Sequence, residues 1–329
     1  MTTPLVTIFI PCCNYGRFLG EAIASVLAQT VSDVELIVIN DGSTDNTRDV
    51  VAGFTDSRIR YIEHDTNRGL LFTLTEGYSA ARGRYVARLD ADDRYRPSFL
   101  ASVLPVFEQH PDVGLVYGDI AAMDLDGRIT EEPWSGIGSR RAHGGQDAIG
   151  DEFLAQVEDN VIPAAAVIAR RECWQQALPF PDWFTFHAPS DWYLNLRVAR
   201  HYSVGYKAEV VADYRLHPLN LHRQHVPGPS EEMTVRGVLD EMLQGEDRTA
   251  AKQQVRGRIC ARAALRAGDS YLGAGLQRDA LRCYLRAVRF QPSLATRPDV
   301  LRHLLGALIG RSLYDRIKGR YLSGERPTG

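Results

Sequence analysis

The chain of 329 residues contains no apolar run that approaches the roughly 20 uninterrupted residues of a membrane-spanning helix. Its 5 cysteines include no CxxC pair and no metal-ligand spacing, so neither a disulfide framework nor a zinc site is expected, and a reducing cytoplasm fits this usage. The first apolar run, Leu5 to Cys13, follows no basic residue and contains Pro11, which favours a buried strand over a signal peptide. These absences predict a globular protein that is cytoplasmic or peripheral at the inner face of the cell membrane.

A nucleic-acid-binding module is also missing, although charge is unevenly distributed. Residues 250–329 hold 16 Lys and Arg against 5 Asp and Glu, a balance of +11, and the net charge of −3 therefore leaves about −14 on residues 1–249. We expect the basic end to meet an anionic surface, a protein partner or the acidic first part of the same chain. Because that first part is acidic, no nucleic acid is expected as a partner.

Short apolar runs alternate with helical patterns along the first 120 residues. The strand-like runs are Val6–Pro11, Val34–Asn40, Ile59–His64, Tyr85–Leu89 and Val113–Ile120, and the helical patterns between them are Phe18–Gln29, Thr47–Ala52, Leu70–Ala81 and Pro97–Gln109. This alternation predicts an α/β fold with a Rossmann-like, doubly wound mixed sheet in which most strands are parallel. Such sheets build ligand sites in the loops that follow their strands, which here carry Asn14, Asp41, Asn67 and Asp90.

The later part of the chain has a different composition. Residues 124–160 show no clear period and are expected to form loops over a cleft, and Pro227-Gly228-Pro229 is expected to separate domain 1–228 from a smaller all-α domain, 229–329. The spacing of Gly268, Tyr271, Ala280, Tyr284, Ala287 and Pro292 predicts one tetratricopeptide-like helix pair at about 261–294. A basic amphipathic end at about 298–322, containing Arg311, Arg316, Lys318 and Arg320, suits an anionic membrane surface or, equally, a packed helix.

The strongest chemical signal is Asp90-Ala91-Asp92-Asp93, directly after an apolar run. Three carboxylates within four residues repel one another, and a strand end that gathers them often does so around a divalent cation. A solvated acidic turn is the alternative. The second signal is Asp41, which follows Val34–Asn40 and precedes Gly42. Its carboxylate is placed to accept hydrogen bonds from a nucleotide base, or it belongs to an ordinary turn.

Together these residues resemble the inverting family 2 glycosyltransferases of the GT-A fold. The resemblance runs from about Val6 to about His225 and rests on Ile10-Pro11-Cys12-Cys13-Asn14-Tyr15, Glu21-Ala22-Ile23, Ser25-Val26-Leu27-Ala28-Gln29-Thr30, Asp41, Asn67-Arg68-Gly69 and Leu89-Asp90-Ala91-Asp92-Asp93. It implies transfer of a sugar from a nucleotide-diphosphate sugar, most often a UDP-sugar, to a hydroxyl of a glycan, glycolipid or protein-linked acceptor. It also implies a process, the assembly of surface polysaccharide, glycan or glycolipid.

The resemblance assigns roles to individual residues. The donor-binding set that it implies is Pro11, Asn14, Tyr15, Asp41, Asn67, Asp90, Ala91, Asp92 and Arg215. Pro11 and Asp41 would line the base pocket, and Asp90 would approach the ribose. Asp92 would bind Mn²⁺ or Mg²⁺ that bridges the donor diphosphate, with His217 either as a further metal ligand or as a structural residue. Arg215 and Arg223 would pair with phosphate oxygens, and His222 and His225 follow in the sequence.

The family places its catalytic base in a Glu-Asp pair at the start of a helix, and Ser190-Asp191 occupies that place here. Asp191 is therefore the expected general base, with helix capping as its alternative role. Ser190 replaces the usual Glu and Cys13 the usual Tyr, and these departures bear on acceptor positioning and on donor identity. Trp183, shortly before Asp191, is the tryptophan that we expect to stack on an acceptor sugar.

Two other functions compete with a glycosyltransferase. A sugar-1-phosphate nucleotidyltransferase would need a Gly-rich, basic phosphate loop after the first strand, and Pro11-Cys12-Cys13-Asn14-Tyr15-Gly16-Arg17 does not supply one. A non-catalytic scaffold acting through the helical end would have no need of Asp90, Asp92 and Asp191. The sequence therefore favours an enzyme.

Overall fold

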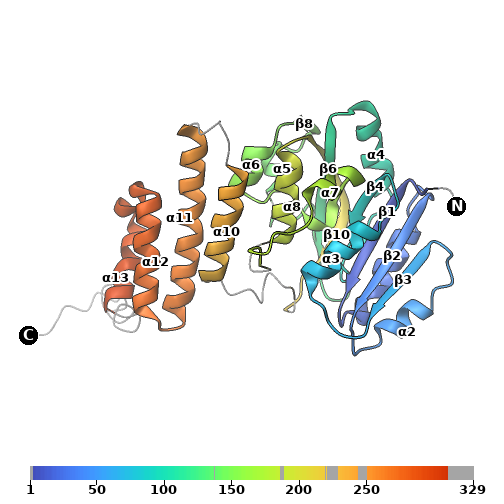
Figure 1. Ribbon diagram of the computed structural model, residues 1–329, viewed down its shortest axis with the longest axis horizontal. Helices are drawn as coiled ribbons and strands as arrows, with labels where there is room; N and C mark the ends of the chain where they lie inside the picture. The colour runs from blue at the N-terminus through green and yellow to red at the C-terminus, as the bar shows by residue number, and fades with distance from the viewer. Residues whose placement is uncertain are drawn as a thin grey trace, which may run out of the picture. The chain divides into compact units, whose positions relative to one another are not determined.

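The computed structural model describes residues 3–136, 138–185, 189–218, 220, 229–243 and 250–309, and the chain divides into two compact units (Figure 1). The first unit consists of Met1–Pro181 and Pro189–Asn220, and the second of Asp182–Ala188 and Leu221–Gly329. The short segment directly ahead of helix α8 (Ser190–Ala199) thus belongs to the second unit. The change of composition near residue 228 gives no sign that residues 182–188 belong to the second unit.

The first unit is built on one mixed sheet. Its strands are β1 (Val6–Cys12), β2 (Val34–Asp41), β3 (Ile59–His64), β4 (Tyr85–Arg88), β5 (Arg94–Tyr95), β6 (Val113–Met123), β7 (Ile129–Glu131), β8 (Ala148–Gly150), β9 (Val167–Arg170) and β10 (Ser203–Arg215). The main order is β3-β2-β1-β4-β9-β6-β10-β5, with β7 paired to β6 and β8 to β10. The helices are α1 (Gly16–Leu27), α2 (Thr47–Ala52), α3 (Leu70–Ala80), α4 (Phe99–Gln109), α5 (Ser139–Ala142), α6 (Phe153–Glu158), α7 (Arg171–Ala177) and α8, with a 3-10 turn, η1 (Ala164–Ala166).

Strand direction decides where the candidate residues lie. β1 pairs parallel with β2 and β4, β2 pairs parallel with β3, and β10 pairs parallel with β6. β9 is antiparallel to both β4 and β6, so β4, β6 and β10 also run in one direction. The chain therefore leaves β1, β2, β4 and β10 at the same edge of the sheet, near Asn14, Asp41, Asp90 and His217.

The strands form because they can bury both faces. Ile8 and Ile10 of β1 have no exposed surface and join Leu19 of α1 in the main core on one face, whereas Phe9 between them, also fully buried, packs against Tyr78 of α3 on the other face. A parallel sheet covered on both faces needs such near-continuous apolar runs. This is why the strand pattern of the first 120 residues predicts the observed elements closely.

The family-like sequence at the end of α1 and just after it stabilises the fold. Gln29 donates through Nε2 to the carbonyl of Arg96 at 2.8 Å and accepts through Oε1 from the backbone N–H of Leu100 at 3.2 Å. The hydroxyl of Ser25 accepts from the N–H of Tyr95 at 3.1 Å. These bonds tie α1 to β5 and α4, which follow the acidic turn 90–93.

The segment 124–160, expected as loops, contains short elements pinned to the sheet. Glu152 accepts from the hydroxyl of Tyr117 at 3.0 Å and lies 3.1 Å from His143. Burial raises the pKa of Glu152 to about 7 and lowers that of His143, so this contact joins two groups that both favour their neutral forms. Asp119 next to them accepts from Ser139 and Arg140 at 3.0 Å each. Contacts with residues far away in the sequence therefore order this segment. The hydrophobic pattern of the segment does not indicate them.

The second unit is helical. It contains α10 (Pro229–Met242), α11 (Ala250–Gly273), α12 (Gln277–Phe290), the 3-10 turn η2 (Pro292–Thr296) and α13 (Pro298–Ile309), which pack in chain order (Figure 1). The ring of fully buried Tyr284 covers Gly268, and its hydroxyl donates to Asp269 at 2.7 Å. In the described part of the chain, no helix has the length and apolar character to cross a membrane. Arg311, Arg316, Lys318 and Arg320 lie outside the described residues.

The Gly268–Tyr284 contact makes a stability prediction. A Cβ at Gly268 would lie 2.5 Å from the Tyr284 ring, whereas one at Gly306 of α13 would meet only Leu272, at 3.6 Å. We expect Gly268→Ala to lower the free energy of unfolding by about 1–3 kcal/mol through overpacking. The matched change Gly306→Ala should be neutral or stabilising by about 0.5–1 kcal/mol, since alanine is the better helix former. Urea unfolding followed by circular dichroism measures both, and equal effects would contradict this packing.

Candidate functional site

The acidic turn 90–93 is held by two arginines. Asp90 accepts two hydrogen bonds from Arg88, Nε to Oδ1 at 2.8 Å and Nη2 to Oδ2 at 2.7 Å. Asp93 is buried and accepts from the backbone N–H of Arg215 at 2.9 Å. Burial, with the charges of Asp92 and Asp90, holds the pKa of Asp93 well above its ordinary value and favours its neutral form. The three carboxylates are therefore not equivalent.

Asp92 faces the end of β10. Its Oδ2 lies 2.9 Å from Nε2 of His217 and 3.4 Å from Nδ2 of Asn220. The imidazole stacks on Phe18, with ring centroids 5.6 Å apart, and lies 5.9 Å from the ring of Tyr15. Burial and the neighbouring Asp90 raise the pKa of Asp92, although His217 opposes the shift. Asp92 thus carries a partly buried carboxylate beside a second one.

This pair is the candidate metal position. Nothing in the described residues forms a group of three or more His, Cys, Asp or Glu side chains that could hold a metal ion. Asp92 and His217 would supply one carboxylate oxygen and one imidazole nitrogen, a pair of ligands that suits Mn²⁺. A cation would also offset the repulsion between Asp90 and Asp92. Among the described residues, the donor set therefore fits an open divalent site.

Arg215 departs from its expected role as a phosphate ligand. Its side chain is fully buried, and its donors bind protein oxygens: Nε the carbonyl of Asp92 at 2.8 Å, Nη1 the carbonyls of Asp124 and Leu125, and Nη2 the carboxylate of Glu21 at 2.8 Å. A guanidinium enclosed in this way cannot reach a ligand. Arg215 instead links the acidic turn, the 124–125 loop and α1. Glu21, part of the family-like motif, is its partner.

Asn14 and Asn67 also bind protein atoms. Asn14 has a φ of 60° and accepts through Oδ1 from the N–H of Thr44 at 2.8 Å, which joins the loops after β1 and β2. Asn67 donates to Sγ of Cys13 at 3.2 Å and accepts from the N–H of Gly69 at 2.8 Å. Both shape the loops of the expected donor pocket. Pro11 is half-buried in β1 at this edge, and Ala91 is buried in the main core.

Asp41 is the centre of a second polar cluster. Oδ1 accepts from the N–H of Arg68 at 2.8 Å, and Oδ2 from the N–H of Gly69 at 3.0 Å. Nδ1 of His64 lies 2.8 Å from Oδ1 of Asp41, and Nε2 lies 2.8 Å from the carboxylate of Glu76 on α3. Since carboxylates only accept, both ring nitrogens must donate, which requires the imidazolium form. No motif in the sequence marks His64 or Glu76 as functional.

Asp191 lies in the first turn of α8, where no side-chain capping bond forms. Its Oδ2 instead accepts from Nδ2 of Asn160 at 3.1 Å. Burial lowers the pKa of the Arg88 guanidinium, but Asp90 and, more weakly, Asp191 raise it above the ordinary value. Asp191 is thus close enough to Arg88 to act on it electrostatically, together with the acidic turn.

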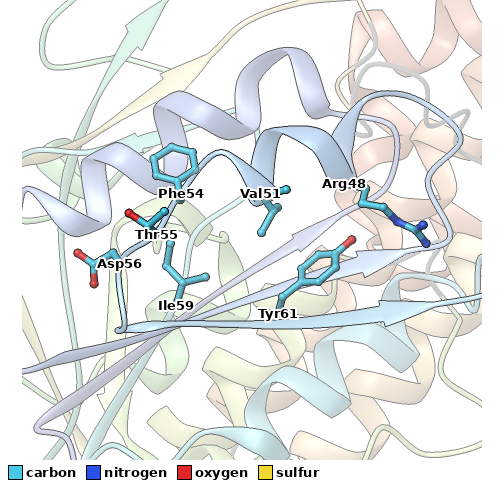
Figure 2. Close-up of a pocket in the computed structure, with 8 residues that line it drawn as sticks. Arg48, Val51, Phe54, Thr55, Asp56, Ile59 and Tyr61 are labelled. Atoms are coloured by element: carbon cyan, nitrogen blue, oxygen red, sulfur yellow. The ribbon is translucent and has the colours of Figure 1, made fainter.

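Other candidates lie elsewhere. Trp183 belongs to the second unit, where its ring lies against Gly237 of α10 and remains 42% exposed, so its stacking on an acceptor sugar stays a prediction. His222, Arg223 and His225 lie outside the described residues. A hollow of about 350 Å³ between α2 and β3 is lined by Arg48, Val51, Ala52, Phe54, Thr55, Asp56, Ile59 and Tyr61 (Figure 2). None of the predicted site residues lines it.

The His64 cluster predicts a pH dependence of stability. Burial lowers the pKa of His64, but its bonds to Asp41 and Glu76 outweigh this and raise it above 6.5. The stabilisation is then complete below about pH 6.5, where His64 is charged in both the folded and unfolded chain, and is lost as pH rises through the folded-state pKa. His64→Gln should therefore lower the free energy of unfolding by about 1–3 kcal/mol at pH 6 and by less at pH 8.5.

Urea unfolding of both proteins at pH 6 and pH 8.5 measures this difference. Glu76→Gln removes one of the two carboxylates and should reduce the pH dependence without abolishing it. A penalty for His64→Gln that is the same at both pH values would contradict a charged His64.

Part of the chain matches a known protein family. Residues 7–155 match the model of glycosyl transferase family 2. An uncharacterized glycosyltransferase of Nostoc sp. is 40% identical over 114 residues, 34% of this chain and 35% of its own length. The chondroitin synthase of Pasteurella multocida is 34% identical over 128 residues, 38% of this chain and 13% of its own length. The chain thus spans about a third or less of these curated relatives.

Solved structures extend the likeness to the fold of the whole chain. S. aureus TarS 1–349 aligns with a TM-score of 0.64 at 15% identity, covering 98% of this chain and 92% of TarS 1–349. The mannosyltransferase PcManGT of Pyrobaculum calidifontis, solved with GDP-Man and Mn²⁺, aligns with a TM-score of 0.57 at 16% identity over 96% and 88% of the two chains. These likenesses confirm the predicted GT-A-type α/β fold with a helical C-terminal region. Residues 7–155 thus carry the match to glycosyl transferase family 2, and a helical region follows the part of the chain that matches.

Proposed function

We propose that this protein is an inverting, metal-assisted glycosyltransferase that moves a sugar from a nucleotide-diphosphate donor to a hydroxyl acceptor. Two groups of side chains at the ends of parallel strands carry the proposal. Asp41 is the carboxylate expected to bind the nucleotide, and Asp92 with His217 is the carboxylate–imidazole pair expected to bind the metal. Asp191 acts on Arg88 beside the same turn. Nucleotide, diphosphate and acceptor chemistry each have a candidate residue there.

The donor is proposed to be a UDP-sugar. Solved TarS structures carry UDP-GlcNAc or UDP, and PcManGT carries GDP-Man, so both bases occur among proteins of this fold. In this chain, Pro11, Tyr15 and Asp41 would border the base. Oδ2 of Asp41 accepts from the N–H of Gly69, and a carboxylate oxygen can accept a second hydrogen bond, here from a base N–H. Asp90, about a third exposed, would lie near the ribose.

Asp92 and His217 would hold Mn²⁺ or Mg²⁺ against the donor diphosphate. The ion would supply Lewis-acid stabilisation of the nucleoside diphosphate as negative charge builds on it. The protein's own contribution is rigidity, because Phe18 and Tyr15 pack against the imidazole and Arg215 holds the carbonyl of Asp92. Loss of this support would displace the Asp92 ligand.

Asp191 would serve as the general base. It takes the proton of the acceptor hydroxyl as that oxygen bonds to the anomeric carbon, while the bond from this carbon to the diphosphate oxygen breaks on the opposite face. Configuration is inverted because a single displacement occurs. A carboxylate held by a side-chain amide and not by its own helix suits this role, since one oxygen is fixed while the other is left for the acceptor.

The acceptor is proposed to be a glycan, glycolipid or protein-linked sugar, within surface polysaccharide or glycolipid assembly. Region 229–329 is proposed to meet an anionic membrane surface or a protein partner. Exposed Leu301, Leu305 and Leu308, which recur along α13, support this role.

Asp191→Asn should abolish transfer and retain donor binding. The amide keeps the size of the side chain but cannot take a proton, so UDP release from UDP-GlcNAc with water as acceptor should fall by at least about a hundredfold. Calorimetric titration with UDP and Mn²⁺ should give an unchanged dissociation constant. Unimpaired turnover by this variant would remove Asp191 as the base.

The nucleotide class is tested by thermal unfolding with UDP, GDP or dTDP, each with Mn²⁺ or with EDTA. One nucleotide should raise the melting temperature in the presence of metal, since ligand at a hundred times its dissociation constant stabilises by about 2.7 kcal/mol. Asp92→Asn should lose the metal-dependent part of the shift. If no nucleotide at millimolar concentration changes the melting temperature, a non-catalytic scaffold becomes the better account.

A further inference from the structure

A chain of two amides leads to Asp191, and a backbone group fixes its direction. The N–H of Val161 donates to Oε1 of Gln156 at 3.1 Å. Because a backbone N–H can only donate, the oxygen of the Gln156 amide must face it, and Nε2 must point the other way. Nε2 then donates to Oδ1 of Asn160 at 2.8 Å.

The same logic settles the amide of Asn160. Since its oxygen accepts from Gln156, its nitrogen is the atom that faces Asp191, and Nδ2 donates to Oδ2 at 3.1 Å. An inverted Asn160 would set two donors against each other on one side and two acceptors on the other. The chain from Val161 to Asp191 therefore presents a donor, and only a donor, to the carboxylate.

The surroundings keep this chain in place. Gln156 is fully buried, and its carbonyl accepts from Nε1 of buried Trp192, the residue after Asp191, at 2.7 Å. Two hydrogen bonds therefore connect residues 156–160, in and just after α6, with the start of α8. One goes to the Asp191 carboxylate and the other to Trp192. Only the first touches a group that would move a proton.

We propose that Asn160 is a positioning residue for Asp191, an inference that rests on the proposed function. By binding Oδ2, Asn160 holds the carboxylate in one orientation and leaves Oδ1 as the oxygen that receives the acceptor proton. A hydrogen bond donated to a carboxylate also favours its ionised form, which is the form that a general base needs. Gln156 acts at one remove, by fixing the amide of Asn160.

The test compares Asn160→Ala with Trp192→Phe. Each removes one of the two bonds between the α6 segment and α8, but only the first removes the bond to Asp191. The readout is the pH profile of UDP release from UDP-GlcNAc with water as acceptor, together with the dissociation constant of UDP in the presence of Mn²⁺. Asn160→Ala should lower kcat/KM about tenfold to a hundredfold, as misplaced catalytic groups do, and move the acid limb to higher pH. UDP affinity should not change.

Trp192→Phe should leave the acid limb where it is in the wild type. Asn160→Asp keeps the size of the side chain, so it remains informative if the alanine variant fails to fold. It sets a second carboxylate against Asp191 and should move the acid limb further than Asn160→Ala does.

Three results would overturn the proposal. The first is a wild-type rate and pH profile for both Asn160 variants, and the second is an equal effect of Asn160→Ala and Trp192→Phe, which would make the bond a structural tie only. The third is an acid limb that moves to lower pH in Asn160→Asp. If Asp191→Asn loses transfer while Asn160→Ala does not, only the positioning role fails. Full turnover by Asp191→Asn would remove the base assignment itself.

Discussion

The buried guanidinium of Arg215 is the constraint on which the candidate site depends. It contacts three separate parts of the first unit: the acidic turn through the carbonyl of Asp92, the 124–125 loop, and Glu21 of α1. A charge taken out of water in this way needs all its hydrogen-bond partners. Arg215 therefore forces the end of β10, and His217 two residues later, to stay beside the turn that follows β4. The Asp92–His217 pair is a product of that requirement.

Much of the site could be predicted because strand ends are readable in the sequence. Asp41 and Asp90 follow apolar runs directly, and parallel pairing of β2, β1 and β4 brings them to one edge. Arg215 was predicted to bind the donor phosphates because the sequence shows its residue type and its position in the motif. The sequence does not show that its side chain is buried. The role of such a residue is decided by β6 and α1, which lie far away in the chain.

His64 and Asn160 show a second limit of prediction. Each acts through a side chain remote in sequence: Glu76 and Asp41 for His64, and Asp191, 31 residues on, for Asn160. No spacing rule connects such residues. For His64, the one available signal in the sequence is a polar residue that ends a predicted strand shortly before the Asn67-Arg68-Gly69 turn. Asn160 lies in the stretch 124–160, which has no clear hydrophobic period. Its hydrogen bond to Asp191 depends on the packing of the α6 segment beside α8 and cannot be read from the sequence.

The return of the chain at residues 182–185 has an evolutionary consequence. Trp183 lies against Gly237, and Thr185 shares a hydrogen bond of 2.8 Å with Thr234, so the residues that lead into α8 have their packing partners on α10. Recombination at a single point after Asn220 would separate these partners and leave the Trp183 segment with a foreign surface. Exchange of the helical region between relatives thus needs two coordinated crossovers. Residues 182–185 should therefore be inherited together with α10 in this lineage, even though the 43 residues 186–228 lie between them in the sequence.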